Sequence, residues 1–299
     1  MTYTPPADAP KPRLHVLVIG IEDDQDGGFE SPPQSGKVHK FARLKRAVAD
    51  AERMAQDLRA GAAGKYAGEP GLVLLRNSEA TRAGISLAID EMAASIAPRE
   101  TFILFVAAHG FSNRSGFYLI PHDIKHGWHG GYLDVEAIGQ PLLQDWLANR
   151  IKACKVLVLL DTCESGALVG GSLLQRIAGA SSGTSIGRLH EATGRPVLTA
   201  AAGGQVAFEG VTAIDGAKHG VFTAAVMEAL HRGDSNGNGT IELSELVAFV
   251  EFAVPRLAQT SGGQGATRSA TSLASPQTRS QLARFGSRGE DFSLVKRLD

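Results

Sequence analysis

Two short runs of apolar residues in this chain each lead to a side chain that is capable of catalysis. Residues 102–106 (FILFV) lead to His109, and residues 156–160 (VLVLL) lead to Asp161 and Cys163. Continuous apolar runs of about five residues are typical of strands buried on both faces, as in a parallel sheet covered by helices. Ligands bind beyond the carboxyl ends of such strands, so neighbouring strands would bring His109 and Cys163 together there.

Helical periodicity occupies the segments between the apolar runs. Residues 42–59 and 81–96 place apolar side chains at helical spacing, and an apolar run follows each of them. The expected strands are Leu14–Gly20, 72–75, 101–108, one ending at Asp161, 196–201 and a late edge strand within 291–298; the expected helices are 42–59, 81–96, about 134–149, 220–231 and 243–257. Strands that alternate with helices predict an α/β fold built on a parallel sheet.

Polar stretches separate several of these elements, and we expect them to be loops. They are rich in Gly, Ser, Pro or Gln and cover residues 21–37, 178–187 and 259–279. We expect a flexible tail over residues 1–12 and a single domain over residues 13–299. A chain of 299 residues with 43% apolar content can bury one large core.

The overall charge and the cysteine content bear on partners and cell compartment. Lys and Arg total 30 against 31 Asp and Glu, and the formal net charge of -1 favours neither nucleic acid nor an anionic membrane as a partner. No apolar run approaches the roughly 18 residues that a membrane-spanning helix needs. Cys154 and Cys163 are the only cysteines, too few for a disulfide framework. We therefore expect a cytoplasmic protein.

Cys163 and His109 form a candidate nucleophile and base. A thiol is mostly protonated at neutral pH, so a catalytic cysteine needs a base, and His109 would take its proton. The backbone N–H groups of Gly110 and Cys163 would stabilise the oxyanion that develops on a substrate carbonyl. Because Asp161 and Glu164 disfavour another negative charge nearby, we expect a neutral thiol at rest. The alternative is a buried structural cysteine, the commonest role of free cysteine.

The sequence around both residues resembles that of caspase-like cysteine proteases. His109-Gly110 and residues 161–166 (DTCESG) are similar to the His-Gly and Asp-x-Cys-x-Ser-Gly motifs of this family, in particular of metacaspases and bacterial caspase homologues. Further similar stretches are residues 49–52 (ADAE), 202–205 (AGGQ), 219–223 (HGVFT) and 284–292 (RFGSRGEDF). The resemblance implies a caspase-type sheet of about six mainly parallel strands with helices on both faces. It also implies cleavage of peptide bonds through His109 and Cys163.

The resemblance extends to the substrate. Metacaspases accept Arg or Lys before the scissile bond through acidic pocket residues, and Asp50 and Asp161 match the two aspartates concerned. Two carboxylates in a partly dry pocket suit a guanidinium or ammonium group. The chain departs from the metacaspase pattern at Ala47 and Ala107, where metacaspases usually have cysteine and serine. The alternative for Asp50 is a solvated helix carboxylate.

Members of this family are often cut in the linker after the nucleophile, and bacterial relatives often serve in cell death or defence. Arg176, Arg188 and Arg195 lie in or near that linker, so the resemblance implies self-cleavage there. The competing hypothesis is a catalytically silent caspase-fold module that binds peptides or calcium.

A second motif, residues 234–245 (DSNGNGTIELSE), lies between two expected helices. It fits the twelve-residue calcium loop of an EF-hand, with glycine at the sixth position. The candidate ligands are Asp234, Asn236, Asn238, Thr240, Glu242 and Glu245. Since only Asp234, Glu242 and Glu245 supply charge, we expect modest calcium affinity and a modulating role. The alternative is an Asn/Gly turn that keeps this geometry without metal.

Overall fold

A six-stranded sheet forms the centre of the computed structural model, which describes residues 10–23, 43–113, 116–125, 132–162, 189–191, 193–200, 207–260, 284–286 and 291–299. Across the sheet, the strands are β12 (Arg284–Gly286), β8 (Val197–Thr199), β7 (Lys155–Asp161), β3 (Thr101–Ala107), β1 (Leu14–Gly20) and β2 (Gly71–Arg76). All neighbours are parallel except β12, which runs antiparallel to β8. This confirms the predicted α/β fold with a mainly parallel sheet.

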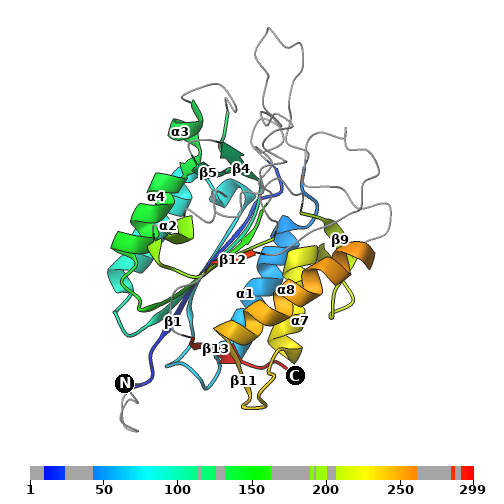
Figure 1. The fold of residues 1–299 in the computed structure, drawn as a ribbon. Coiled ribbons are helices and arrows are strands. Elements are labelled where there is room, and N and C mark those ends of the chain that lie inside the picture. The colour runs from blue at the N-terminus through cyan, green and yellow to red at the C-terminus, as the bar shows by residue number, and fades with distance from the viewer. Residues whose placement is uncertain are drawn as a thin grey trace.

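Helices cover both faces of this sheet (Figure 1). One layer holds α1 (Ala47–Ala62), α7 (Val221–Arg232) and α8 (Leu243–Thr260); the other holds α2 (Arg82–Ser95), α4 (Gln140–Gln144) and the π-helical turns at Asp145–Arg150. Along β1, Val16 and Val18 pack on the α1 side, whereas Leu17 and Ile19 pack on the α2 side. Burial on both faces explains why the strands are continuously apolar rather than alternating.

Smaller sheets flank the central one. The first consists of β4 (Gly110–Asn113), β5 (Gly116–Leu119) and β6 (Ile138–Gly139), with helix α3 (Tyr132–Glu136) beside it. The second is the pair β9 (Glu209–Thr212) and β10 (Lys218–Gly220), and the third is the pair β11 (Thr240–Glu242) and β13 (Ser293–Lys296). In Figure 1, β4 and β5 lie toward the upper end of the molecule, to which β1 runs, and β11 and β13 lie at the opposite end.

Two predicted elements differ in the structure. The single helix expected near 134–149 is wrong, because strand β6 interrupts it: Gly139 precedes Pro141, which starts a new helix in α4. The strand expected within 291–298 does form, as β13, but it pairs with β11. The edge of the central sheet is taken by β12 instead.

Helix α1 packs closely against the end of β1. A side chain on Gly20 would place its Cβ 2.7 Å from the carbonyl oxygen of Ala47 and 2.7 Å from the Cβ of Ala51. Only glycine allows the helix to come this near to the strand. This close approach sets the first turn of α1, which carries Asp50, beside the carboxyl end of β1.

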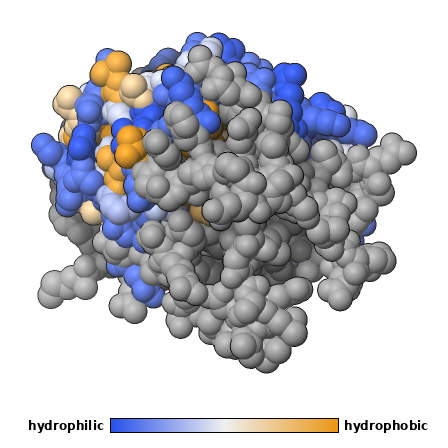
Figure 2. Space-filling model, turned by 90° about the horizontal axis from the view of Figure 1, so that it is seen from above, coloured by the Kyte–Doolittle hydropathy of each residue, from blue (hydrophilic) through white to orange (hydrophobic). Residues whose placement is uncertain are grey.

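The described surface is mostly hydrophilic in the view from above, and a few hydrophobic residues gather on the side of α3 and α4 (Figure 2). Among the described residues, the large exposed hydrophobic side chains are Leu87, Val135 and Phe252. They belong to three different helices, so they do not together define a binding surface. No helix in the described part of the chain is both long and apolar enough to cross a bilayer.

Candidate active site

His109 follows the buried strand β3, and backbone hydrogen bonds fix its place. Its carbonyl accepts a hydrogen bond from the Ile120 N–H at 3.1 Å, and Gly110 begins strand β4. The N–H of Ala108 donates to the carbonyl of Asp161 at 3.4 Å, so β3 and β7 stay paired up to this point. His109 is 7% exposed. Strand pairing therefore fixes the backbone at His109, and the residue is largely shielded from solvent.

Asp161 ends strand β7, next to the strand that carries His109. It is the register partner of Ala107 on β3. Its side chain is fully buried, and the Thr223 hydroxyl donates a hydrogen bond to the carboxylate at 2.7 Å. A buried carboxylate is costly unless it is hydrogen-bonded or paired, so this contact ties β7 to the first turn of α7.

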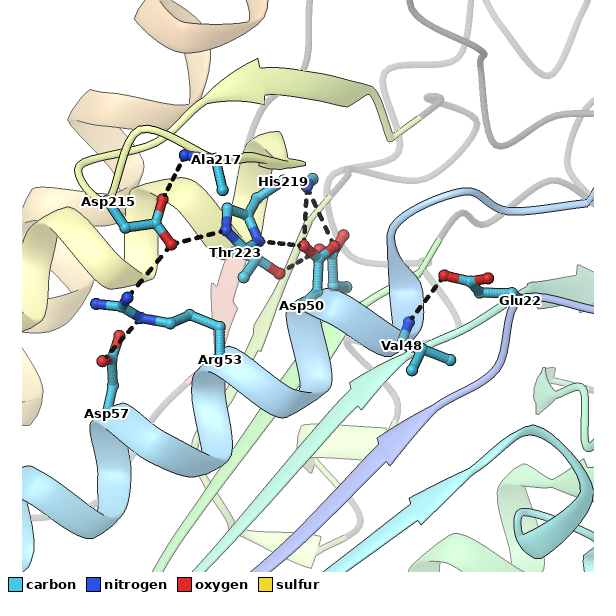
Figure 3. A network of polar contacts seen from close by, with 11 residues as sticks. Glu22, Val48, Asp50, Arg53, Asp57, Asp215, Ala217, His219 and Thr223 are labelled. Carbon is cyan, nitrogen blue, oxygen red and sulfur yellow. Dashed lines mark hydrogen bonds and ion pairs between the residues drawn. The ribbon is translucent and has the colours of Figure 1, made fainter.

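Asp50 lies in the first turn of α1, and its carboxylate is also fully buried. The Nδ1–H of His219 donates to Asp50 Oδ1 at 2.8 Å, and the Gly220 N–H lies 3.3 and 3.1 Å from the two carboxylate oxygens (Figure 3). Gly220 is the N-cap residue of α7. The interpretation of Asp50 as a solvated helix carboxylate is therefore wrong, because Asp50 joins α1 to the start of α7.

A series of alternating charges continues from Asp50 (Figure 3). The Nε2–H of His219 donates to Asp215 Oδ2 at 3.1 Å. Asp215 Oδ2 also lies 3.3 Å from Arg53 Nη1, and Arg53 Nε lies 3.0 Å from Asp57 Oδ1. Burial lowers the pKa of His219, but its hydrogen bonds and ion pairs with Asp50 and Asp215 outweigh burial and raise that pKa above the ordinary value.

The acidic members of this network respond differently to their surroundings. Burial raises the pKa of Asp215, but the Ala217 N–H and the His219 ring stabilise the carboxylate and lower its pKa overall. For Asp57, burial is the larger effect, and it raises the pKa despite the contact with Arg53. Hydrogen bonds and ion pairs therefore outweigh burial at Asp215, whereas burial outweighs them at Asp57.

The two aspartates predicted to bind substrate meet at the first turn of α7. Asp50 accepts the Gly220 N–H at the N-cap, and Asp161 accepts the Thr223 hydroxyl three residues further along. Acidic groups are stabilised at the amino end of a helix, where the unpaired N–H groups carry partial positive charge. The structure thus brings both aspartates to one helix end, and His109 lies beside Asp161.

The predicted nucleophile Cys163 lies outside the described residues, as do Glu164, Arg176 and Arg188. Their predicted roles, including the oxyanion contact of the Cys163 N–H, stay predictions. Thr162, the residue before Cys163, is described and fully buried.

Arg195, the third candidate for self-cleavage, has a structural role. Its guanidinium donates hydrogen bonds to the carbonyls of Leu147, Ile151 and Cys154 at 3.3, 3.4 and 3.5 Å. Burial lowers the pKa of the Arg195 side chain. Arg195 therefore joins β8 to the end of the π-helical turns and is held by the fold.

The EF-hand-like loop lies, as predicted, between α7 and α8, and hydrogen bonds within the loop determine its shape. The Asp234 carboxylate accepts the N–H groups of Asn238 at 3.1 Å and Gly239 at 2.9 Å. The side-chain oxygen of Asn236 accepts the Asn238 N–H, and that of Asn238 accepts the N–H of Thr240. Four of the predicted calcium ligands therefore take part in local turns.

The remaining predicted ligands are also engaged by neighbours. Glu245 accepts hydrogen bonds from the N–H groups of Ser235, Asn236 and Glu242. Burial raises the pKa of Glu245, but these hydrogen bonds outweigh burial and lower it overall. The Glu242 carboxylate accepts the amide groups of Asn236 and Asn238. The carboxylates of the loop thus have hydrogen-bond partners within it, and Arg297 lies 3.7 Å from Asp234 as well.

Across the described residues, no three His, Cys, Asp or Glu side chains come together in a way that could hold a metal ion. The side-chain oxygens of the loop would have to leave their N–H partners in order to surround a cation. Calcium binding by this loop therefore stays a prediction.

Several residues of the site were not predicted from the sequence as having a role: His219, Asp215, Arg53 and Thr223. One signal for His219 was present, because His219-Gly220 repeats the His-Gly pair of residues 109 and 110. A second signal concerned Asp50, which lies three residues after Ala47 and four before Met54 on the apolar stripe of α1. That spacing indicates burial of Asp50.

Comparison with known proteins supports the fold and identifies a family. A sequence model of the caspase domain matches residues 15–280. Protein GSU0716 from Geobacter sulfurreducens has a similar structure, with a TM-score of 0.50, 18% identity, and coverage of 91% of this chain and 98% of that chain. The structure of pro-Sf-caspase-1 has a TM-score of 0.52 and 14% identity, and covers 94% of this chain and 96% of its own. A search of curated proteins found no significant match.

Proposed function

The chain belongs to the caspase domain family, and on this premise we propose that it is a cysteine endopeptidase that cleaves after Arg or Lys. Cys163 is the nucleophile and His109 is the general base. The N–H groups of Gly110 and Cys163 hold the oxyanion. Asp50 and Asp161 attract the cationic side chain of the substrate.

The register of the two central strands carries this proposal. Strands β3 and β7 pair Ala107 with Asp161. His109 comes two residues after Ala107, and Cys163 comes two residues after Asp161. Adjacent strands lie about 4.8 Å apart, so this equal offset supports a short path between imidazole and thiol. A short path is the first requirement for proton transfer.

The reaction proceeds in two halves. His109 takes the thiol proton of Cys163 while the sulfur attacks the scissile carbonyl carbon, and the carbonyl oxygen becomes an oxyanion held by the N–H groups. The C–N bond then breaks, and the His109 imidazolium gives its proton to the leaving amine. Water activated by His109 hydrolyses the resulting thioester and restores the thiol.

Buried carboxylates support the basic specificity. Asp50 and Asp161 are both fully buried and both contact the first turn of α7. Two carboxylates can receive the fork of a guanidinium or the point charge of an ammonium group. The donors from Gly220 and Thr223 orient the two carboxylates and carry no full charge, whereas His219 pairs with Asp50. The negative charge that this pairing leaves would attract a cationic substrate.

Fluorogenic peptides with Arg, Lys or Asp before the scissile bond test the proposal. We expect cleavage of the Arg and Lys peptides, and a loss of at least about 100-fold in kcat/KM for Cys163→Ala and His109→Ala. The matched controls are Cys154→Ala, at an exposed cysteine, and His231→Ala at the far end of α7. A preference for Asp contradicts the basic specificity, and absence of cleavage favours the silent module.

Self-processing belongs to the same proposal. Arg176 and Arg188 are the better candidates for the cut, because the fold holds the side chain of Arg195. Purified wild-type protein should split into two fragments, whereas Cys163→Ala should stay intact and Arg195→Lys should still split. Equal integrity of wild type and Cys163→Ala contradicts self-processing.

A further inference from the structure

His219 is a charged group beside the proposed substrate pocket, and the mechanism above gives it no role. The side chain is buried, with Nδ1 2.8 Å from Asp50 and Nε2 3.1 Å from Asp215. An ionised carboxylate can only accept hydrogen bonds, so both ring nitrogens must carry a hydrogen. The contacts therefore define a buried imidazolium.

Among the described residues, the charges near this ring come from three elements. Helix α1 contributes Asp50, Arg53 and Asp57, and the turn between β9 and β10 contributes Asp215. Strand β7 contributes Asp161. Its carboxylate accepts the Thr223 hydroxyl in the first turn of α7, which begins directly after His219 and Gly220. The positive charges of His219 and Arg53 lie among more numerous carboxylates, so loss of the His219 proton removes a cation that directly contacts Asp50.

We propose that His219 is a positioning residue that holds Asp50 in place and sets how strongly this carboxylate attracts the cationic side chain of the substrate. The inference rests on the proposed function and deepens it. A charged ring cancels part of the negative charge of Asp50, whereas a neutral ring leaves that charge to the substrate. KM for an Arg peptide therefore falls as the pH rises through the titration of His219.

The coupling between ring and substrate must act in both directions. If loss of the His219 proton strengthens binding of a cation, then a bound cation must favour loss of that proton by the same factor. A guanidinium in the pocket consequently lowers the pKa of His219. This reciprocal effect can be measured without any turnover.

The kinetic test compares an Arg peptide with its citrulline analogue, which is neutral and of similar shape, across the titration of His219. In wild type, we expect KM for the Arg peptide to fall by about 5-fold or more, a typical coupling, while KM for the citrulline peptide stays constant. Asp215→Asn should move this transition to lower pH, because it removes one of the carboxylates that stabilise the imidazolium. His219→Gln, which keeps one donor toward Asp50, should abolish the transition.

The binding test uses agmatine, a small guanidinium, and nuclear magnetic resonance of the His219 ring in Cys163→Ala protein. We expect agmatine to lower the pKa of His219, and to leave it unchanged in a protein that also carries Asp50→Asn. A KM profile that is identical in wild type, Asp215→Asn and His219→Gln overturns the inference, as does a His219 titration that agmatine does not move.

The two tests separate this inference from the proposed function. If wild type cleaves Arg peptides through Cys163 and His219→Gln behaves like wild type, the endopeptidase stands and the role of His219 fails. If no peptide is cleaved but agmatine shifts the titration of His219, the cation pocket stands and the endopeptidase fails.

Discussion

The two ends of helix α7 both gather carboxylates, but they hold them in different ways. At the amino end, Asp50 is fully buried, and its partner His219 lies 169 positions away in the sequence. At the carboxyl end, Asp234 and Glu245 accept N–H groups that lie at most ten positions away. These hydrogen bonds of the carboxyl end are local, although Arg297 also lies 3.7 Å from Asp234 and β13 pairs with β11 beside the loop. The amino end forms only when α1, β10 and α7 come together.

This difference separates a structural turn from a candidate active site. A charge buried among long-range partners has lost its hydration, and only those partners offset the loss. Perturbed charges cluster at functional sites, and structural ion-pair networks produce them too. We propose that the amino end of α7 is the functional end, and the following changes test the distinction.

His219→Ala should have the largest effect on stability. The change leaves the carboxylates of Asp50 and Asp215 without the cation between them, and breaking a buried ion pair in this way costs about 3–5 kcal/mol. The measurement is urea unfolding at mildly acidic pH, where His219 is charged. The matched change at the carboxyl end is His231→Ala, whose ring makes an exposed hydrogen bond, with an expected effect within about 0.5 kcal/mol. Equal effects at the two ends contradict the comparison.

Asp161→Asn should affect activity next most strongly. Asparagine keeps the shape and can still accept the Thr223 hydroxyl, but it removes the charge. We expect kcat/KM for an Arg peptide to fall by about 100-fold, the scale for losing one member of a desolvated charge pair. The kcat/KM for the citrulline analogue should fall far less. Asp90→Asn, at an exposed carboxylate on α2, is the control. An unchanged ratio between the Arg and citrulline peptides refutes the role of Asp161.

The contributions of the two ends of α7 to stability should be lost in opposite directions of pH change. The pKa of His219 is raised by folding, so its contribution to stability is full below the ordinary value of 6.5 and is lost as the pH rises through the folded-state pKa. The pKa of Glu245 is lowered, so its contribution is full above the ordinary value of 4.5 and is lost as the pH falls through the folded-state pKa.

Urea midpoints across this pH range measure both contributions. His219→Gln should flatten the loss of stability on the alkaline side, and it should also weaken the acid-side contribution of Asp215, whose pKa is lowered partly by His219. Glu245→Gln should flatten the loss of stability on the acid side and leave the alkaline side unchanged. The charge states described for the two ends are contradicted if His219→Gln changes only the acid side and Glu245→Gln only the alkaline side. They are also contradicted if neither variant changes the pH dependence of stability.

Calcium should have the smallest effect. If the loop at the carboxyl end of α7 binds it, the dissociation constant should lie between about 10⁻⁴ and 10⁻³ M, as in weak EF-hand sites. A tenfold excess over that constant then stabilises the protein by about 1.4 kcal/mol. Calorimetric titration of wild type and Glu245→Gln measures this binding. Identical binding by the two proteins removes the loop as the site.

Much of the fold could be predicted from the sequence because its signals are local. The apolar runs that became β3 and β7 report burial on both faces, and their ends led directly to His109 and Asp161. The loop after α7 could equally be predicted, since its twelve positions follow one another in the sequence. The break at Gly139 and Pro141 was local too, but apolar periodicity across it favoured one helix.

The rest of the site depends on which distant segments meet. The pairing of β13 with β11 joins the end of the chain to the loop after α7, and nothing in either strand specifies the other. The same holds for Asp50 and His219. Each of the two residues belongs to a stretch that resembles the family. Their contact, however, arises from the packing of α1 against α7, which a single sequence does not report.

The most direct test of the central claim is covalent labelling by a peptide chloromethylketone that carries Arg, followed by mass spectrometry of the intact and digested protein. We predict one label per chain, on Cys163 and not on Cys154, with loss of labelling in His109→Ala and little reaction with the matched Asp reagent. Labelling of Cys154 in place of Cys163, or faster reaction with the Asp reagent, would contradict a cysteine endopeptidase of basic specificity.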